Sequence, residues 1–240
     1  MKTLQFSDDR IQLAAALRLA SRYNWQRAVD NHFTVAVDED RFLVNPKGMH
    51  WSEITASKLL LVNHQGALLE GDGEVESSAF HIHSHIHRRL ASARCVLHAH
   101  PTYATALSCL EGGRLENCHQ DALRFYGRVM YDSDFNGSAF DDAEGCRIAA
   151  ALGNGHVLVM AHHGLTVVGP SVAEAFADFY FFEAACEYQI TAMSSGAPLK
   201  IMNDERAGKL AAEMFDPDQV PLHFQAMLRL LERTEPDYAS

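Results

Sequence analysis

The stretch Cys95-Val96-Leu97-His98-Ala99-His100-Pro101 combines a short apolar run with a pair of histidines. The apolar residues at its start predict a buried strand that leads directly into the pair. Along a strand, residues i and i+2 point to the same face, so His98 and His100 should project together. Two imidazoles on one face can share a divalent metal ion such as zinc, manganese or iron. We therefore expect a buried strand that ends in two metal ligands.

A third ligand is offered by a second run of the same kind. His156 to Ala161 is strand-like and apolar, and it is followed directly by His162-His163-Gly164. A His-x-His pair alone is weak evidence, because the chain has 14 histidines in 240 residues and such pairs arise by chance. Two strands that each end in histidine are stronger evidence. The sequence therefore predicts a metal site formed by His98, His100 and His163.

Composition narrows the kind of protein and its partners. Hydrophobic residues make up 48% of the chain and charged residues 21%, close to the average of a globular protein. The net charge is −11, and no run of Lys or Arg is long enough to follow a phosphate backbone. We therefore expect neither nucleic acid nor an anionic membrane surface as a partner.

Location is suggested by the chain start and by the cysteines. The first ten residues contain one Lys, one Arg and no apolar core, so we expect no signal peptide. No apolar run approaches the roughly 18 residues of a membrane helix. The five cysteines are scattered and show no Cys-x-x-Cys spacing, as is typical of reduced thiols. These features predict a cytoplasmic protein.

Strand-like and helical stretches alternate along the chain. Helices are expected at 11–23, 51–57, 77–90, 103–110, 141–152, 172–194 and from 202 onward, and strands at 33–37, 41–44, 59–62, 95–97 and 156–161. The pattern shows no internal repeat, low-complexity stretch or linker. It predicts a single α/β domain over residues 1–240, with a short polar tail at about 234–240.

The helical stretch 77–90 carries His81, His83, His85 and His87 at alternate positions. A step of two residues turns a helical side chain by about 200°, so only residues four apart share a face. We therefore expect packed or surface histidines here rather than a metal tract. His83 is expected to point inward, because it shares a stripe with Phe80 and His87.

Several motifs, in this order, resemble those of the class II aldolase/adducin family, which includes fuculose-phosphate aldolase, ribulose-phosphate epimerase and the adducin head domain. The resemblance extends from about Leu13 to Ser195. Its motifs are Asn45-Pro46-Lys47-Gly48, the histidine-rich segment 80–87, the segment 95–100, His162-His163-Gly164-Leu165 with Val168-Gly169, and Glu174-Ala175-Phe176 leading to the segment 183–189.

The resemblance implies a three-layer α/β/α fold with a central, mostly antiparallel sheet. It also implies a divalent metal ion, zinc with manganese or iron as alternatives, on the histidines that match His98, His100 and His163. Family aldolases are usually homotetramers with the site near a subunit interface, so a homotetramer that acts on a small-molecule substrate is expected.

One departure from the family concerns proton transfer. In the sugar-phosphate aldolases a catalytic glutamate follows two serines, whereas here Ser77-Ser78 is followed by Ala79, which cannot transfer a proton. The resemblance leaves Thr34, Lys47 and Ser77 as candidate contacts for a phosphate or carboxylate group of the substrate.

The proton must then come from another group. His119, Tyr126 and Tyr131 lie between the metal motifs, and Glu76 lies three residues before the lost position. Histidine and tyrosine act as general acids or bases when the site tunes their pKa. We therefore keep His119, Tyr126 and Tyr131 as candidate catalytic residues, with packed aromatic or surface groups as the alternative.

Three functions fit the sequence. The first is a metal-dependent lyase that cleaves a carbon–carbon bond, by retro-aldol cleavage or decarboxylation, in a small hydroxy-carbonyl or carboxylate compound. The second is an Fe(II) oxygenase that uses the same three histidines. The third is a non-catalytic, adducin-like interaction domain, which the missing glutamate favours and the complete set of histidines opposes.

Overall fold

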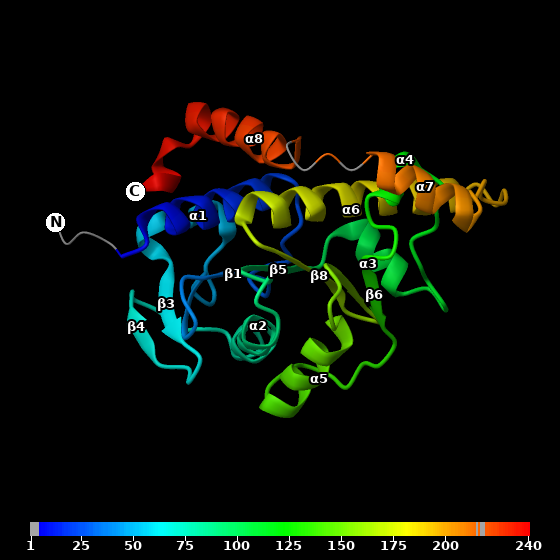
Figure 1. Ribbon diagram of the computed structural model, residues 1–240. Coiled ribbons are helices and arrows are strands. Elements are labelled where there is room, and N and C mark those ends of the chain that lie inside the picture. Colours follow the sequence, from blue (N-terminus) through cyan, green and yellow to red (C-terminus); the bar gives the residue numbers. More distant parts are fainter. Residues whose placement is uncertain (1–4, 215, 217–218) are drawn as a thin grey trace.

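Eight strands form one continuous sheet in a computed structural model of the protein, which describes residues 5–214, 216 and 219–240 (Figure 1). The order across the sheet is β4-β3-β2-β1-β5-β8-β7-β6. The strands are β1 (His32–Ala36), β2 (Arg41–Val44), β3 (Leu60–Asn63), β4 (Leu68–Glu70), β5 (Cys95–Ala99), β6 (Val129–Asp132), β7 (Val157–Met160) and β8 (Gly164–Gly169). Only β6 and β7 pair in parallel, so the prediction of a mostly antiparallel sheet is confirmed.

Helices cover both faces of the sheet. The helices are α1 (Ser7–Arg22), α2 (Ser77–Arg89), α3 (Thr102–Ser108), α4 (Gln120–Leu123), α5 (Asp142–Leu152), α6 (Val172–Met193), α7 (Asp204–Met214) and α8 (Val220–Thr234), with short 3₁₀ helices η1 (Trp51–Glu53), η2 (Ala56–Lys58) and η4 (Pro236–Ala239). In Figure 1, α1 and α6 lie above the sheet, α2 and α5 lie below it, and α8 lies over α1 and α6. The three-layer α/β/α arrangement is therefore confirmed.

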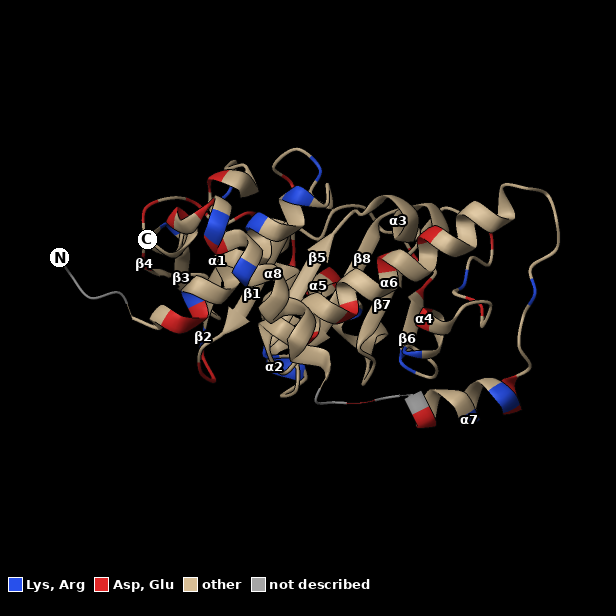
Figure 2. Ribbon diagram, turned by 90° about the horizontal axis from the view of Figure 1, so that it is seen from above, with Lys and Arg blue, Asp and Glu red and all other residues tan. Residues whose placement is uncertain are grey.

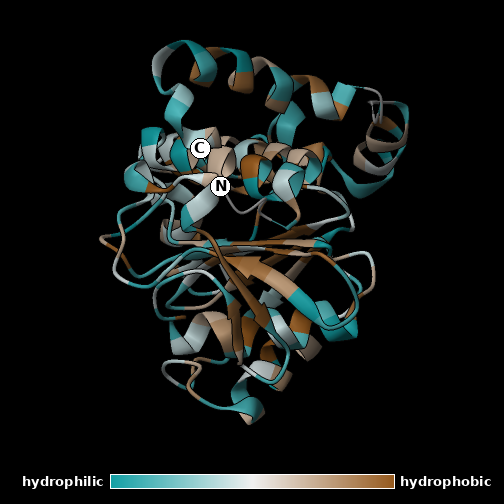
Figure 3. Cartoon of the chain, turned by 90° about the vertical axis from the view of Figure 1, so that its left-hand side faces the viewer, coloured by the Kyte–Doolittle hydropathy of each residue, from teal (hydrophilic) through white to brown (hydrophobic). Residues whose placement is uncertain are grey.

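The core is divided by the sheet into two sides, because side chains alternate along each strand. Leu97 of β5 packs with Phe176 and Phe179 of α6, while its neighbour Val96 packs with Ile82 of α2. Figure 3 shows the hydrophobic strands in the middle of the molecule and hydrophilic positions on the outer helices. His98 therefore points, with Val96, to the side of the sheet that α2 covers.

Charged residues lie mostly on the outside of the helical layers. In α1 the acidic residues Asp8 and Asp9 lie in the first turn and Arg22 lies in the last, whereas acidic and basic positions are interspersed along α7 (Figure 2). No helix among the described residues is long and apolar enough to cross a membrane.

The sequence missed three strands. The sequence pattern does not predict β6, which follows the short helix α4, and it does not predict β4 or β8. β4 is three residues long and half exposed, so it carries little hydrophobic signal. The helix expected at 51–57 is two 3₁₀ helices, separated by the extended residues Ile54 and Thr55.

The C-terminal residues form part of the fold. The polar tail expected at 234–240 contains η4, and Tyr238 within it is buried. Arg18 of α1 donates to Glu235 at 3.0 Å and to Asp237 at 2.7 Å. The end of the chain is therefore held against the first helix.

Candidate metal centre

Strand pairing brings the three predicted histidines together. β5 pairs with β8, so that His98 lies opposite Thr166 and Ala99 opposite Leu165. β7 and β8 form a hairpin whose turn carries His163, and this turn therefore lies next to the end of β5. One ligand nitrogen from each of His98, His100 and His163 lies within 4.8 Å of the others. The three ring centroids are 4.8–5.2 Å apart.

His98 is held by a neighbour on the sheet. Its Nδ1 lies 3.0 Å from the hydroxyl of Thr166, and the residue is 1% exposed. The hydroxyl of Thr166 in turn lies 3.5 Å from the sulfur of Met160. With Nδ1–H donating to Thr166, the lone pair of His98 is on Nε2, where it is free to bind a metal.

His100 contributes a buried nitrogen without a partner. Its Nε2 has no hydrogen-bond partner among the described residues. Such an atom is costly unless something binds it, since nearly all buried polar atoms are paired. A Cβ at Gly164 would lie 2.5 Å from Cδ2 of His100 and 2.8 Å from the carbonyl oxygen of Ala99. The ring of His100 therefore takes its place only because residue 164 has no side chain.

Burial keeps all three imidazoles neutral near pH 7. It lowers the pKa of His98 well below its ordinary value, and the neighbouring His163 acts in the same direction. Burial also lowers the pKa of His100 to about 4, again helped by His163. The pKa of His163 is lowered by burial, but the carboxylates of Asp132 and Glu144 oppose this shift. Neutral imidazole is the form that binds metal, so the three residues fit a divalent ion.

The predicted substrate contacts lie in two different settings. Lys47 and Ser77 are exposed, and the backbone N–H of Lys47 donates to the carbonyl of Glu74 at 2.8 Å, which joins the loop of Lys47 to the segment before α2. Thr34 is fully buried, with its hydroxyl 2.6 Å from His83 and 2.8 Å from His87. Lys47 and Ser77 are thus free to meet a substrate, whereas the hydroxyl of Thr34 already has protein partners.

The predicted proton donors are not brought together. His119 caps α4 and packs on Tyr188, with ring centroids 4.3 Å apart. The hydroxyl of Tyr131 accepts from the N–H of Leu115 at 3.0 Å, and its ring lines a cavity of about 260 Å³ beside His162. No contact described for these residues or for Tyr126 involves the three histidines. Their catalytic roles stay predictions.

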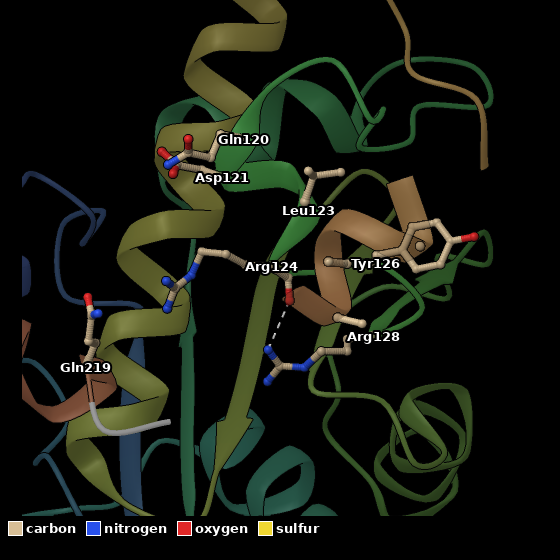
Figure 4. Close-up of a pocket in the computed structure, with 10 residues that line it drawn as sticks. Gln120, Asp121, Leu123, Arg124, Tyr126, Arg128 and Gln219 are labelled. Atoms are coloured by element: carbon tan, nitrogen blue, oxygen red, sulfur yellow. Dashed lines mark hydrogen bonds between the residues drawn. The ribbon is translucent and has the colours of Figure 1, made fainter. Parts of the chain in front are cut away.

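Tyr126 lines another cavity, of about 450 Å³, between α4 and α7 (Figure 4). Its hydroxyl donates to the carbonyl of Asp204 at 3.3 Å. Arg124 and Arg128 also line this cavity, and Arg128 donates to the carbonyl of Arg124, as the dashed line in Figure 4 shows. None of the three clustered histidines lines it, so its size does not make it the site of metal chemistry.

One neighbour of the centre was missed by the sequence. His32 of β1 lies directly opposite His98 on the adjoining strand, and the two rings stack with centroids 4.9 Å apart. The register between β1 and β5 produces this contact. No short-range pattern predicts that register, since 66 positions separate the two residues in the sequence.

Fold and site together define an α/β protein with a cluster of three neutral histidines, one buried and two half-buried, at the ends of strands in the middle of a mostly antiparallel sheet. Comparison with known families agrees with this description. Residues 11–190 match the Class II Aldolase and Adducin N-terminal domain. The chain belongs to this family.

The relatives include proteins named for class 2 aldolases and adducins. A Pseudomonas aeruginosa protein described as an aldolase class 2 protein is 32% identical over 95% of this chain and 91% of its own length. Human beta-adducin is 30% identical over 93% of this chain, which spans only 33% of the length of that relative. Family membership alone therefore does not decide between an enzyme and an interaction domain.

Solved structures of two relatives superpose over nearly the whole chain. An aldolase II superfamily protein from Pseudomonas syringae has a TM-score of 0.92 and 33% identity, and covers 99% of this chain and 97% of its own. The L-fuculose 1-phosphate aldolase of Glaciozyma antarctica has a TM-score of 0.85 and 26% identity, and covers 99% and 96%. An enzyme of carbon–carbon bond cleavage is thus among the proteins that share this fold.

Proposed function

We propose that the protein is a metal-dependent lyase that cleaves a carbon–carbon bond in a small hydroxy-carbonyl or carboxylate compound. The observation that carries this proposal is the complete cluster of His98, His100 and His163, with a buried, unpartnered Nε2 on His100. A non-catalytic domain has no need of three imidazoles whose ligand atoms converge, one of them buried and two half-buried.

The chemistry of the donors suggests the metal. Three neutral imidazoles suit zinc, and manganese or iron are the alternatives. When bound, such an ion would act as a Lewis acid that offsets negative charge on a substrate oxygen as the bond breaks. His98 and Thr166 fix the orientation of one ligand ring, and Gly164 leaves the space that the ring of His100 occupies.

Other residues would bind and orient the substrate. Lys47 is exposed on a loop and Ser77 is exposed at the start of α2, where an ammonium group and a hydroxyl can contact a phosphate or carboxylate. As a family aldolase, the protein would be a cytoplasmic homotetramer, and a neighbouring subunit could bring His119, Tyr126 or Tyr131 to the site.

A second candidate is an adducin-like interaction domain. Two observations favour it: Ala79 replaces the glutamate of the aldolases, and human beta-adducin aligns with 93% of the chain. An Fe(II) oxygenase on the same histidines is the third candidate.

One experiment separates the three functions. The purified protein is stripped with chelator, reloaded with zinc, manganese or iron, and tested on L-fuculose 1-phosphate and on hydroxy-carboxylic acids, with and without oxygen. Metal-dependent cleavage without oxygen supports the lyase. Turnover that needs iron and oxygen supports the oxygenase, and a protein that binds no metal and turns over nothing supports the interaction domain.

A further inference from the structure

A chain of buried hydrogen bonds leads away from the metal centre between α2 and the sheet. Nδ1 of His32 lies 2.7 Å from Nε2 of His83, and Nδ1 of His83 lies 2.6 Å from the hydroxyl of Thr34. That hydroxyl lies 2.8 Å from Nε2 of His87, whose Nδ1 is 2.7 Å from the carbonyl of Ala93. We call His32, His83, Thr34 and His87 the histidine relay; each is at most 9% exposed.

The carbonyl of Ala93 fixes where every proton of the relay lies. A carbonyl only accepts, so Nδ1 of His87 carries a proton and its Nε2 accepts from the hydroxyl of Thr34. The single proton of Thr34 is then used, so Nδ1 of His83 must donate to it. Burial lowers the pKa of His87 to about 4 and that of His83 well below its ordinary value, so both rings are neutral at pH 7.

The same logic continues to His32. A neutral His83 with its proton on Nδ1 accepts at Nε2, so His32 donates from Nδ1. Nε2 of His32 is therefore an acceptor that faces the start of α2. There it lies 3.3 Å from the hydroxyl of Ser78 and 3.9 Å from the carboxylate of Glu76.

When Glu76 is ionised, no proton is left for the hydrogen bond between Ser78 and Nε2 of His32. The hydroxyl of Ser78 has a single proton and is hydrogen-bonded to Glu76, so it cannot also serve His32. If Glu76 holds a proton, it donates to Ser78 and Ser78 donates to His32. All hydrogen bonds from Glu76 to Ala93 then run in one direction, which strengthens each of them.

The end of the relay also adjoins the metal centre. The ring of His32 stacks on the ring of His98. Glu76 is the N-cap of α2, held by the N–H of Ala79 at 3.0 Å, and its side chain is only partly buried. The carboxylate is thus fixed about one ring away from the predicted metal ligands.

We propose that Glu76 is the catalytic residue that carries the proton, and that Ser78 and the histidine relay are positioning residues that complete its hydrogen bonds while it holds that proton. This proposal rests on the proposed lyase function. It assigns the proton transfer to a carboxylate three residues before Ala79.

The proton balance is simple for both reactions. In retro-aldol cleavage, ionised Glu76 takes the proton of a substrate hydroxyl, the carbon–oxygen bond becomes a carbonyl, and the electron pair of the broken bond stays on the other fragment. Glu76 then returns the proton to that carbon and is ionised again. In decarboxylation, carbon dioxide leaves, protonated Glu76 supplies the proton to the remaining carbon, and water reprotonates the carboxyl group.

The relay is tested without substrate or metal. Nitrogen-15 NMR of the histidine rings should show the proton on Nδ1 in His32, His83 and His87, although free neutral histidine favours Nε2. Thr34→Val removes the hydroxyl at nearly constant shape, so His32 and His83 should lose this fixed tautomer. Thr34→Ser keeps the hydroxyl and should retain it. A proton on Nε2 of His32 in the unaltered protein would overturn the relay.

The catalytic role of Glu76 is tested with dihydroxyacetone as the probe. The measured quantity is the rate at which the hydroxymethyl carbon of dihydroxyacetone takes up deuterium from heavy water. In the zinc-loaded protein, Glu76→Gln should lower kcat for exchange by at least about 100-fold, with KM and zinc content unchanged. The matched control Glu74→Gln removes an exposed carboxylate two residues away and should exchange at the normal rate.

Two further variants keep the test decisive. If Glu76→Gln does not fold, Ser78→Ala should lower kcat by about tenfold without raising KM, because its effect passes through Glu76. Thr34→Val should likewise lower kcat alone, and Thr34→Ser should restore it; a rise in KM alone would instead make Thr34 a substrate contact.

The outcomes separate this proposal from the function on which it rests. Normal exchange in zinc-loaded Glu76→Gln would overturn the role of Glu76 and leave the lyase standing. A zinc-loaded unaltered protein that exchanges no deuterium would count against the lyase and against a catalytic Glu76 together. In that case the tautomer measurement alone decides whether the relay exists.

Discussion

The three histidines of the metal centre are oriented by neighbouring residues of the sheet. His98 and His100 were predicted from strand spacing alone, and His163 from the end of a second apolar run; the structure brings all three together. Their partners could not be predicted in the same way. Thr166, His32 and Gly164 reach the centre through strand register, which the sequence does not show directly.

The absence of a side chain at Gly164 gives a testable prediction about the position of the His100 ring. In Gly164→Ala, the new methyl group would lie 2.5 Å from the ring of His100, so the ring must move. We expect zinc affinity to fall by about tenfold or more, equivalent to about 1.4 kcal/mol, as measured by competition with a chromogenic chelator. Gly112→Ala is the control for steric contact alone: nothing lies within 4 Å of its added Cβ, although its φ of +64° makes alanine strained there. Equal zinc affinity in Gly164→Ala and the unaltered protein would contradict the packing argument.

His87 predicts how stability depends on pH. Its pKa is lowered from 6.5 to about 4, chiefly by burial, so the unfolded chain takes up this proton first as the pH falls. Keeping His87 in its neutral form therefore costs nothing in the free energy of unfolding above pH 6.5. As the pH falls toward 4, the free energy of unfolding drops by about 3 kcal/mol in total because of this residue. Urea unfolding between pH 7.5 and 4.5 should therefore show a shallower pH dependence in His87→Gln. A parallel dependence in the two proteins would refute this assignment.

At the scale of elements, the long periodic segments were predictable and the short ones were not. The predicted helix 172–194 corresponds to α6, and the predicted strand 41–44 is β2. The glycine-bounded strand β8 was missed, although it supplies the partner of His98. The predicted start of the helix at residue 77 is confirmed, and its cap is Glu76, because a carboxylate accepts from a free N–H of the first turn.

The helix after His100 depends on a carboxylate from α6. Both oxygens of Glu183 accept, at 2.8 Å each, from the N–H groups of Tyr103 and Ala104 in the first turn of α3. Glu183→Ala leaves two donors unpaired, and we expect it to lower the free energy of unfolding by about 2–3 kcal/mol. Glu183→Gln keeps one acceptor and should cost about half as much. Denaturant unfolding measures the free energy of unfolding of both variants. If Glu183→Ala and Glu183→Gln were equally stable, the oxygens of Glu183 would not cap α3.

For the whole molecule, the metal should stabilise the fold as well as take part in chemistry. Its predicted ligands come from β5 and from the β7–β8 hairpin, so a bound ion would join two parts of the sheet. Zinc at about 100 times its Kd should add about 2.7 kcal/mol, which raises Tm by about 5–10 °C for a chain of this size. Calorimetry with zinc and with chelator measures this shift. A shift of the same size in His98→Ala would mean that zinc binds elsewhere.

The architecture as a whole followed from the sequence because local and global signals agree. Strand-like runs alternate with amphipathic helices, and the histidine-rich family motifs lie on α2, on β5 and at the β7–β8 hairpin. The site was only partly predictable, since the three histidines lie at strand ends, whereas the roles of Thr34 and Glu76 depend on contacts between β1 and α2.

The central claim is that His98, His100 and His163 hold a divalent metal, and metal analysis of the purified protein tests it most directly. The protein should contain about one metal ion per chain, the His98→Ala variant should lose it while keeping its fold, and His50→Ala, which removes an exposed histidine, should retain it. Metal bound as tightly by His98→Ala as by the unaltered protein would contradict the account.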